Sequence, residues 1–411
     1  MLQKFIDNTF YYLFVFTLIF GVIFYDALGL NFVDELCAIA LCGLYGFYIF
    51  HTSNWSINKM FLLTLCVFIF YLCYSFFIHS NTKAAILSDF IIQLKPYLVF
   101  FTVYAFKPVL NKQMKKNLQL LSIVFSIYLL VIGITSLFSL DILHALLTHQ
   151  SRLATAATIT ALLYLYCSEY TFKDKIIFLL LLAVGLLSGR SKMYGFFVIA
   201  AFLVFYINKN FELKFSSKNI TIFSIAIIAM TIVAWDKINF YFIEGGFGNE
   251  RETQDLYARA ALYYFSIDIF KEYFPFGSGF ATYGTFASGE YYSHIYNDLG
   301  MDVMQGLTEK DPRFIADTYF PSLAQFGVIG AILFFIFWIK LAQKSIHYFH
   351  KDNIKDFAIS IIIICFFLIE CTSDATITHN RGLFIMMLLA LSLTNQQRTL
   401  LNKNEKDPYI K

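Results

Sequence analysis

The feature that most constrains this chain is a series of long apolar runs separated by mostly short polar connections. Inside a membrane no water can satisfy backbone polar groups, so a run of roughly 20 apolar residues must form a helix. Only 14% of the 411 residues are charged, whereas soluble proteins have about 25%. This excludes a soluble enzyme and a disordered chain, and the runs are too long for the strands of a membrane barrel. The sequence predicts an all-α polytopic membrane protein.

About twelve apolar cores are candidate spans. They are Phe10–Leu30, Leu36–Phe50, Met60–Ile78, Phe90–Phe106, Leu118–Leu140, Leu153–Cys167, Ile176–Leu187, Met193–Ile207, Ile220–Trp235, Tyr319–Ile339, Phe357–Ile369 and Leu383–Leu393. The short cores, above all the seventh and the twelfth, must extend through polar ends. The pattern predicts an N-terminal bundle of about nine spans (1–235), a long outer loop (236–318), about three further spans (319–394) and a cytoplasmic tail (395–411).

Lysine and arginine are distributed differently over the predicted connections. With the N-terminus inside, 18 of the 24 lysines fall on the inner side and six of the seven arginines on the outer side. An excess of basic residues marks cytoplasmic connections, which places both termini in the cytoplasm. Codon usage that favours lysine would explain its abundance but not the location of the arginines.

The outer arginines predict an anion site. They are Arg152, Arg190, Arg251, Arg259, Arg313 and Arg381. Arginine presents a rigid, permanently charged fork that fits phosphate and carboxylate groups, whereas lysine is a compact point charge. A diphosphate is the obvious anion that a membrane-borne substrate would carry. The net charge of +3 is too small to argue for nucleic acid.

The long outer loop contains a predicted amphipathic helix over Arg251–Phe274, which Pro275 ends. Its apolar stripe at helical spacing consists of Leu256, Ala260, Tyr263, Ile267 and Phe270. Such a helix could lie at the membrane surface as a lid over a lateral cavity. Arg259 on this helix is a candidate anion ligand, although it could equally be a surface charge paired with Asp255.

Two further segments hold candidate ligands. The connection Leu187–Met193 places Arg190 and Lys192 at the membrane interface, where they could clamp a phosphate or serve as ordinary anchors. The hairpin after the eleventh core contains Glu370, Asp374, His379, Asn380 and Arg381. This hairpin could be part of a sugar or phosphate cavity, or a small polar turn that satisfies itself.

Two residues of the outer loop are candidate bases. Asp317 lies at the mouth of a span, where desolvation can raise the pKa of its carboxyl group and make it a useful base. Asp317 could also be a helix N-cap. His294, which is the only histidine in the loop, could be catalytic or idle. Tyrosines of the loop, such as Tyr283 and Tyr296, could stack on sugars or form the core of the loop.

Three segments, in this order, resemble the bacterial O-antigen polymerase and O-antigen ligase superfamily, the Wzy-type integral membrane glycosyltransferases. They are the turn Ser188–Ser191, the Arg259 helix with the segment Pro275–Phe280 that follows it, and Asp317–Tyr319 leading to Gln325–Gly330. The resemblance covers roughly Leu180 to Lys340.

The resemblance implies a GT-C-like enzyme at the outer face of the bacterial plasma (inner) membrane. It would polymerise O-antigen, capsule or exopolysaccharide from undecaprenyl-diphosphate-linked glycans, without nucleotide sugar, cofactor or metal. Arg190 and Arg259 would bind the diphosphate, and Asp317 or His294 would activate the acceptor hydroxyl. Lys192, Arg313, Arg381, Arg152 and His379 are further candidate ligands for diphosphate or glycan. A chain-length regulator and a flippase are possible partners.

Three alternatives stay open. The first is a ligase that transfers finished glycan to a lipid or protein, although Asp317–Thr318 stands where the ligase pattern has His-Asn. The second is a lipid-linked oligosaccharide flippase or other transporter. Three observations argue against a transporter. The sequence has no internal repeat, and its charges fall at the outer ends of the predicted spans. So long a loop also has no purpose in transport. The third is a membrane scaffold of an assembly complex, which would not need outward-facing arginines.

Overall fold

A computed structural model describes residues 2–30, 32–52, 58–208 and 253–406, which form helices and no strand. The first half contains α1 Leu2–Phe16, the π-helix η1 Thr17–Ile23, α2 Tyr25–Leu28, α3 Val33–His51, α4 Lys59–Ile78, α5 Lys83–Phe106, α6 Lys112–Ser136, α7 Asp141–Leu147, α8 Gln150–Cys167, α9 Phe172–Ala183, η2 Val184–Ser188 and α10 Ser191–Tyr206. The second half contains α12 Thr253–Glu272, α13 Phe286–Glu290, α14 His294–Asp298, α15 Tyr319–Ser322, η4 Leu323–Phe326, α16 Gly327–His347, η5 Lys351–Asn353, α17 Ile354–Glu370, η6 Thr376–Thr378 and α18 Asn380–Lys406.

Within this described part, six helices are long and apolar enough to cross a membrane. They are Leu2–Ile23, Val33–His51, Lys59–Phe77, Lys83–Phe106, Lys112–Ser136 and Tyr319–His347. The shorter helix α10 is also apolar. The all-helical fold is consistent with a polytopic membrane protein, whereas the count of twelve spans and the GT-C-like architecture stay predictions. The ninth predicted core, Ile220–Trp235, lies outside the described residues.

The other predicted cores coincide with helices, but several of the helices end elsewhere. The first core was expected to run to Leu30, yet the helix stops at Ile23 and a short helix, α2, follows. The last helix, α18, continues through residues 395–406, where the sequence predicted the tail. It does so because Gln396 is buried and donates a hydrogen bond to Ser360 of α17 at 2.9 Å.

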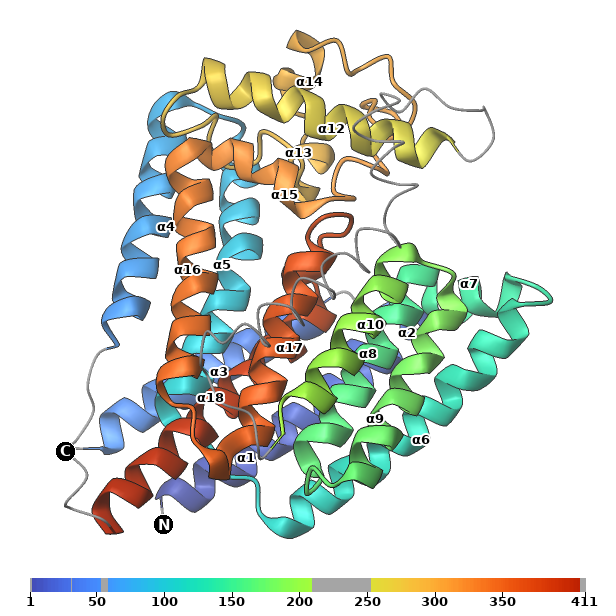
Figure 1. The fold of residues 1–411 in the computed structure, drawn as a ribbon. Coiled ribbons are helices and arrows are strands. Elements are labelled where there is room, and N and C mark those ends of the chain that lie inside the picture. The colour runs from blue at the N-terminus through green and yellow to red at the C-terminus, as the bar shows by residue number, and fades with distance from the viewer. Residues whose placement is uncertain (1, 31, 53–57, 209–252, 407–411) are drawn as a thin grey trace, which may run out of the picture.

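Helix α8 lies at the centre of one half of the bundle, where it packs against α6 and α9. Almost every side chain of α8 is buried, and four of these side chains are alanines (Ala154, Ala156, Ala157 and Ala161). Small residues let helix backbones approach closely, which is the usual basis of helix packing in membranes. On the other side of the molecule α4, α5 and α16 stand together, and α1, α3, α17 and α18 lie between the two groups (Figure 1).

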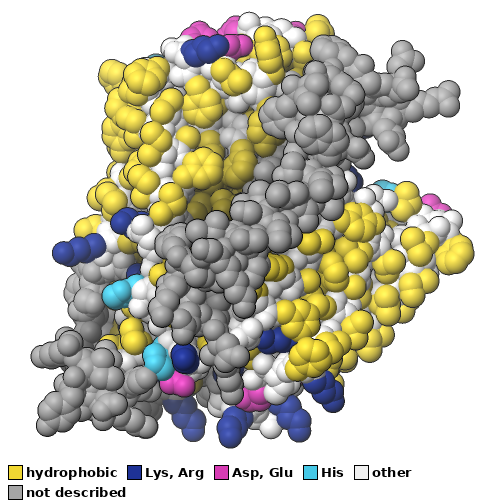
Figure 2. Space-filling view, viewed as in Figure 1, with side chains coloured by type: hydrophobic (Ala, Val, Ile, Leu, Met, Phe, Trp, Pro, Cys, Tyr) yellow, Lys and Arg dark blue, Asp and Glu magenta, His cyan; other side chains and the backbone are white. Residues whose placement is uncertain are grey.

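We call residues 253–318, with α12, α13 and α14, the cap. The cap covers one end of the bundle, and the N-terminal end of α1 and the C-terminal end of α18 lie at the opposite end (Figure 1). Figure 2 shows hydrophobic side chains over most of the face between these ends, with Lys and Arg side chains gathered toward the end away from the cap. The cytoplasmic location of the termini stays a prediction.

The predicted stripe on α12 is wrong. The buried positions are Ala258, Arg259, Ala261, Leu262, Ser266 and Ile269, whereas the side chain of Ile267 is 53% exposed. The buried face of α12 packs against Tyr283 and Tyr296, which are fully buried and stack with ring centroids 5.7 Å apart. These two tyrosines therefore form the core of the cap and are not platforms for sugars.

The segment 275–281 fastens the cap to α4 and α5. Tyr74 of α4 donates a hydrogen bond to the carbonyl of Gly277 at 2.9 Å, and Ser80 donates one to the carbonyl of Phe280 at 2.9 Å. In α5 the buried carboxylate of Asp89 accepts the N–H of Ala281 at 2.7 Å. Gly277 and Gly279 allow this close contact, because an added Cβ at either position would collide with neighbouring atoms.

Replacing Gly277 with alanine should destabilise the docked cap. Gly277 has a φ of +81°, and an added Cβ would collide with the backbone of Gln325 and Gly327. Positive φ alone costs about 1–3 kcal/mol for a residue with a side chain, and the collision adds to this. We expect a lower unfolding temperature for Gly277→Ala than for Gly300→Ala, whose φ is +66° but whose surroundings are open. Equal unfolding temperatures for the two variants would contradict the view that close backbone contact excludes a side chain at position 277.

Candidate functional site

Charged side chains gather where α2, α8, α10, α17 and α18 meet at their cap-side ends. We call them the charged cluster, and they are Asp26, Arg152, Lys192, Glu370, Asp374, His379 and Arg381. The sequence predicted Arg152, Lys192, His379 and Arg381 as ligands from separate segments, and the fold brings them together. Ionisable groups enclosed by membrane helices usually serve a function.

Asp26 joins two arginines of this cluster. Its Oδ2 lies 2.6 Å from Nη2 of Arg381, and its Oδ1 contacts Nη1 of Arg152. The side chains of Asp26 and Arg381 are 1% and 6% exposed, whereas that of Arg152 is 38% exposed. Because one carboxylate serves two guanidinium groups, this part of the cluster has an excess of positive charge.

Lys192 joins the other two carboxylates of the cluster. Its Nζ lies 2.8 Å from Oε1 of Glu370 and 3.2 Å from Oδ2 of Asp374. Thr376 donates a further hydrogen bond to Asp374 at 2.7 Å. Burial alone would raise the pKa of Asp374, but the charge of Lys192 and these hydrogen bonds outweigh it and hold the pKa below its usual value. Asp374 is therefore ionised at neutral pH.

His379 lies in the connection that leads into α18, among several charges. Desolvation by the surrounding protein, together with the charges of Arg152, Lys95 and Arg381, lowers the pKa of His379 to about 4, against the opposing charge of Asp374. Its side chain nevertheless keeps contact with solvent. The imidazole is therefore neutral at pH 7, and it can donate or accept a hydrogen bond at the edge of the cluster.

Arg190 lies two residues before Lys192, at the start of α10. Its Nη2 is 2.5 Å from Nε2 of His149, the residue before α8. The other ring nitrogen of His149, Nδ1, accepts a hydrogen bond from the N–H of Ser151. The contact between Arg190 and His149 directs the guanidinium toward the start of α8, the helix that also carries Arg152. Lys192 belongs to the charged cluster and Arg190 contacts His149 beside α8, while the clamp itself stays a prediction.

Arg259 of α12 forms an ion pair with Asp317, and the side chain of Arg259 is buried. This burial contradicts a charge on the helix surface, whereas the side chain of Asp255, the partner expected in that alternative, lies outside the described residues. The N-cap of α15 is Thr318, so the N-cap interpretation of Asp317 is wrong as well. Asp317 therefore has a charged partner, which the sequence did not suggest.

The Arg259–Asp317 pair is connected to the charged cluster through the segment Cys371–Asp374. Tyr263, one turn after Arg259, donates a hydrogen bond to the carbonyl of Thr372 at 2.8 Å. The N–H groups of Tyr319 and Phe320 donate to the carbonyl of Cys371 at 3.3 and 3.1 Å. The pair and the cluster therefore lie on the same side of the bundle, beneath α12.

His294 and Arg313 lie apart from this arrangement, on the exposed surface of the cap. Nε2 of His294 is 3.9 Å from Asp298 in the next turn, and Nη2 of Arg313 is 3.2 Å from Asp311. The contacts that the described chain gives them are thus local, whereas Asp317, the other candidate base, is paired with Arg259. Arg251 lies outside the described residues.

Sequence reasoning missed the acidic partners Asp26, Asp34 and Glu35, as well as the position of Lys95. Lys95 is buried in the middle of α5, where its Nζ lies 2.7 Å from Oε1 of Glu35 and also contacts Asp34. The expectation that the charges fall at the outer ends of spans is therefore wrong for Lys95. These residues could have been singled out because each lies within or beside an apolar run. Charged residues inside membrane helices are rare and need a partner.

Within the described residues no group of three His, Cys, Asp or Glu side chains could hold a metal ion, and independence from metal stays a prediction. No family model matches the chain, and no curated protein matches its sequence. The arrangement offers guanidinium groups held by carboxylates at two adjoining places, Arg152 and Arg381 at Asp26 and Arg259 at Asp317.

Proposed function

We propose that the protein is a glycan polymerase that transfers an undecaprenyl-diphosphate-linked glycan onto a lipid-linked repeat unit at the outer face of the plasma membrane. The observation that carries the proposal is the ion pair between Arg259 and Asp317. It joins two of the three segments on which the resemblance rests, and it supplies an anion ligand and a base at one place beneath α12.

The proposed reaction uses these two groups directly. The hydroxyl oxygen of the acceptor sugar bonds to the anomeric carbon of the donor sugar, and its proton passes to Asp317. The bond between that carbon and the diphosphate breaks, and the electron pair leaves with the diphosphate. Arg259 stabilises the developing negative charge, which is commonly the largest contribution to catalysis in such a step. The energy comes from the sugar–diphosphate bond, so the reaction needs no nucleotide.

The pairing of Arg259 with Asp317 couples binding of the donor to activation of the base. A donor diphosphate competes with Asp317 for the guanidinium of Arg259. Once the diphosphate takes this position, Asp317 loses its positive neighbour and becomes a stronger base. Binding of the donor would thus prepare the carboxylate that activates the acceptor.

The charged cluster supports a polymerase over a ligase. A polymerase must hold two lipid diphosphates, one on the donor and one on the acceptor, whereas a ligase that uses another acceptor needs one. Arg152 and Arg381 share the carboxylate of Asp26, and this excess positive charge suits a second anion. We assign the donor diphosphate to Arg259 and the acceptor diphosphate to the cluster, with Arg190 and Lys192 beside it.

Deletion of the gene tests this proposal against its alternatives. We expect surface glycan with single repeat units on the final acceptor and no longer chains. Loss of all mature glycan from its acceptor would indicate a ligase. Accumulation of lipid-linked repeat units on the cytoplasmic face would indicate a flippase. An unchanged ladder of glycan lengths would exclude all three activities.

A further inference from the structure

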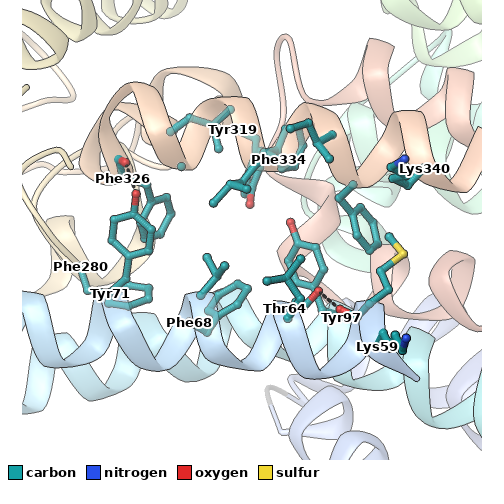
Figure 3. Close-up of a pocket in the computed structure, with 18 residues that line it drawn as sticks. Lys59, Thr64, Phe68, Tyr71, Tyr97, Phe280, Tyr319, Phe326, Phe334 and Lys340 are labelled. Carbon is teal, nitrogen blue, oxygen red and sulfur yellow. Dashed lines mark hydrogen bonds between the residues drawn. The ribbon is translucent and has the colours of Figure 1, made fainter. Parts of the chain in front are cut away.

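An apolar groove of about 330 Å³ lies between α4 and α16, at a distance from the charged cluster. Its walls come from Met60, Leu63, Val67 and Phe68 of α4 and from Leu333, Phe334, Ile336 and Phe337 of α16. Tyr97 of α5 lines the groove as well. Figure 3 shows these two helices running along opposite sides of the groove. The volume lies near the lower end of the range for small-molecule sites, roughly 300–1,000 Å³.

The end of the groove nearest the cap is closed. Tyr71 of α4 donates a hydrogen bond to the carbonyl of Phe326 at 2.6 Å, which ties α4 to the start of α16. Phe280 packs edge-on against Phe326, with ring centroids 5.0 Å apart. Figure 3 shows these three aromatic side chains together at one end. A chain that lies in the groove therefore cannot continue toward the cap at this point.

The opposite end of the groove carries two lysines. Lys59 begins α4 and Lys340 belongs to the last part of α16, and both line the groove at the end away from Tyr71 (Figure 3). Both side chains are exposed. Within the described ranges no carboxylate forms an ion pair with either of them. The groove is thus an apolar channel with two positive charges at its open end.

We infer that this groove binds an anionic phospholipid, with one acyl chain between α4 and α16 and its phosphate against Lys59 and Lys340. Hydrocarbon fits the apolar walls, and lysines at a membrane surface attract anionic headgroups. Only 11% of the apolar window of α4 is buried, so in a membrane most of this helix would contact lipid. This site does not depend on the proposed function.

The position of the lysines favours a phospholipid over the proposed lipid-linked substrate. In the substrate the diphosphate must reach Arg259 or the charged cluster, which lie on the cap side. The two lysines lie at the other end of α4 and α16, the end away from the cap (Figure 1). A lipid with its phosphate at these lysines therefore has its headgroup in the membrane leaflet opposite the cap.

Native mass spectrometry of the purified full-length protein tests the inference. Phosphatidylglycerol and phosphatidylcholine with identical chains are added to the wild type, to Lys59→Ala/Lys340→Ala and to the control Lys112→Ala/Lys116→Ala. The control removes two exposed lysines from the start of α6. We expect phosphatidylglycerol to bind the wild type and the control more tightly than phosphatidylcholine. Loss of Lys59 and Lys340 should weaken it roughly 10- to 30-fold, because each lysine near an anionic lipid contributes about tenfold or less.

A second variant tests the groove itself. Val67→Trp places a large ring among the groove walls while both lysines remain, and it should reduce binding of either phospholipid. The inference is overturned if neither variant differs from the control. It is also overturned if undecaprenyl phosphate, added at the same concentration, displaces phosphatidylglycerol from the wild type but not from Arg259→Ala. These binding measurements do not depend on the glycan lengths of the deletion strain, so either proposal can fail while the other stands.

Discussion

Replacing Arg259 with alanine should abolish chain lengthening while the protein still inserts into the membrane. Arg259 is the buried cation of the cap and is paired with the proposed base Asp317. Its loss removes a charge that stabilises the leaving diphosphate, and removal of one such group commonly costs about 100- to 1,000-fold in rate. In a strain that carries this variant, gels of surface glycan should show single repeat units instead of a ladder.

Two further variants, one at position 259 and one elsewhere on α12, test whether the guanidinium group itself is required. Arg259→Lys keeps the charge but loses the two-pronged guanidinium, so it should also fail if bidentate binding matters. Lys271→Ala removes an exposed cation from the end of α12, where Lys271 pairs only weakly with Asp268 at 3.3 Å, and it should give a normal ladder. A normal ladder from Arg259→Ala, with expression equal to the wild type, would end the proposal that Arg259 holds the diphosphate.

Replacing Asp26 with alanine should have the largest effect on stability in this part of the molecule. The side chain of Asp26 is almost fully buried and forms ion pairs with both Arg152 and Arg381. Removing one partner of a buried ion pair costs about 3–5 kcal/mol, because the remaining charge is left without compensation. Here two guanidinium groups lose their carboxylate at once. Thermal unfolding in detergent, followed by size-exclusion chromatography, should show a strongly lowered unfolding temperature.

The order of effects among the partners distinguishes this explanation from general damage to packing. Arg381→Ala should be less damaging than Asp26→Ala because Arg152 still balances Asp26. Arg152→Ala should be milder again because its side chain is 38% exposed. The exposed Asp268→Ala on α12 serves as the control and should unfold like the wild type. The reverse order would contradict the view that Asp26 holds the two arginines.

Most of the helices could be predicted because their signal is local. A run of apolar residues has few alternatives in a membrane, and Pro275 marked the end of α12 within a few residues. The arginines that the sequence assigns to one side, Arg152, Arg190, Arg259 and Arg381, do lie toward the cap, and the anion site that they suggest stays a prediction. Composition and spacing were sufficient for these features.

Partners across the fold could not be predicted, because they depend on contacts between distant segments. Asp26 lies inside an apolar run, and nothing in its neighbourhood shows that Arg152 and Arg381 converge on it. The buried face of α12 differs from the expected stripe because α12 packs both on the core of the cap and on η4, α15 and α16. A helix with neighbours on more than one side has no single apolar stripe. Arg259 is buried on α12 because Asp317 pairs with its charge.

The most direct measurement reconstitutes the purified protein in vesicles with a single lipid-diphosphate-linked repeat unit, without nucleotide sugar and with a metal chelator. We predict a ladder of lipid-linked glycans of increasing length, with one undecaprenyl diphosphate released for each bond formed. The same vesicles with Arg259→Ala should yield neither product, and those with Lys271→Ala should yield both. If the active wild-type preparation from a complemented strain elongates no glycan under these conditions, or if Arg259→Ala elongates it at the wild-type rate, the account of this site is contradicted.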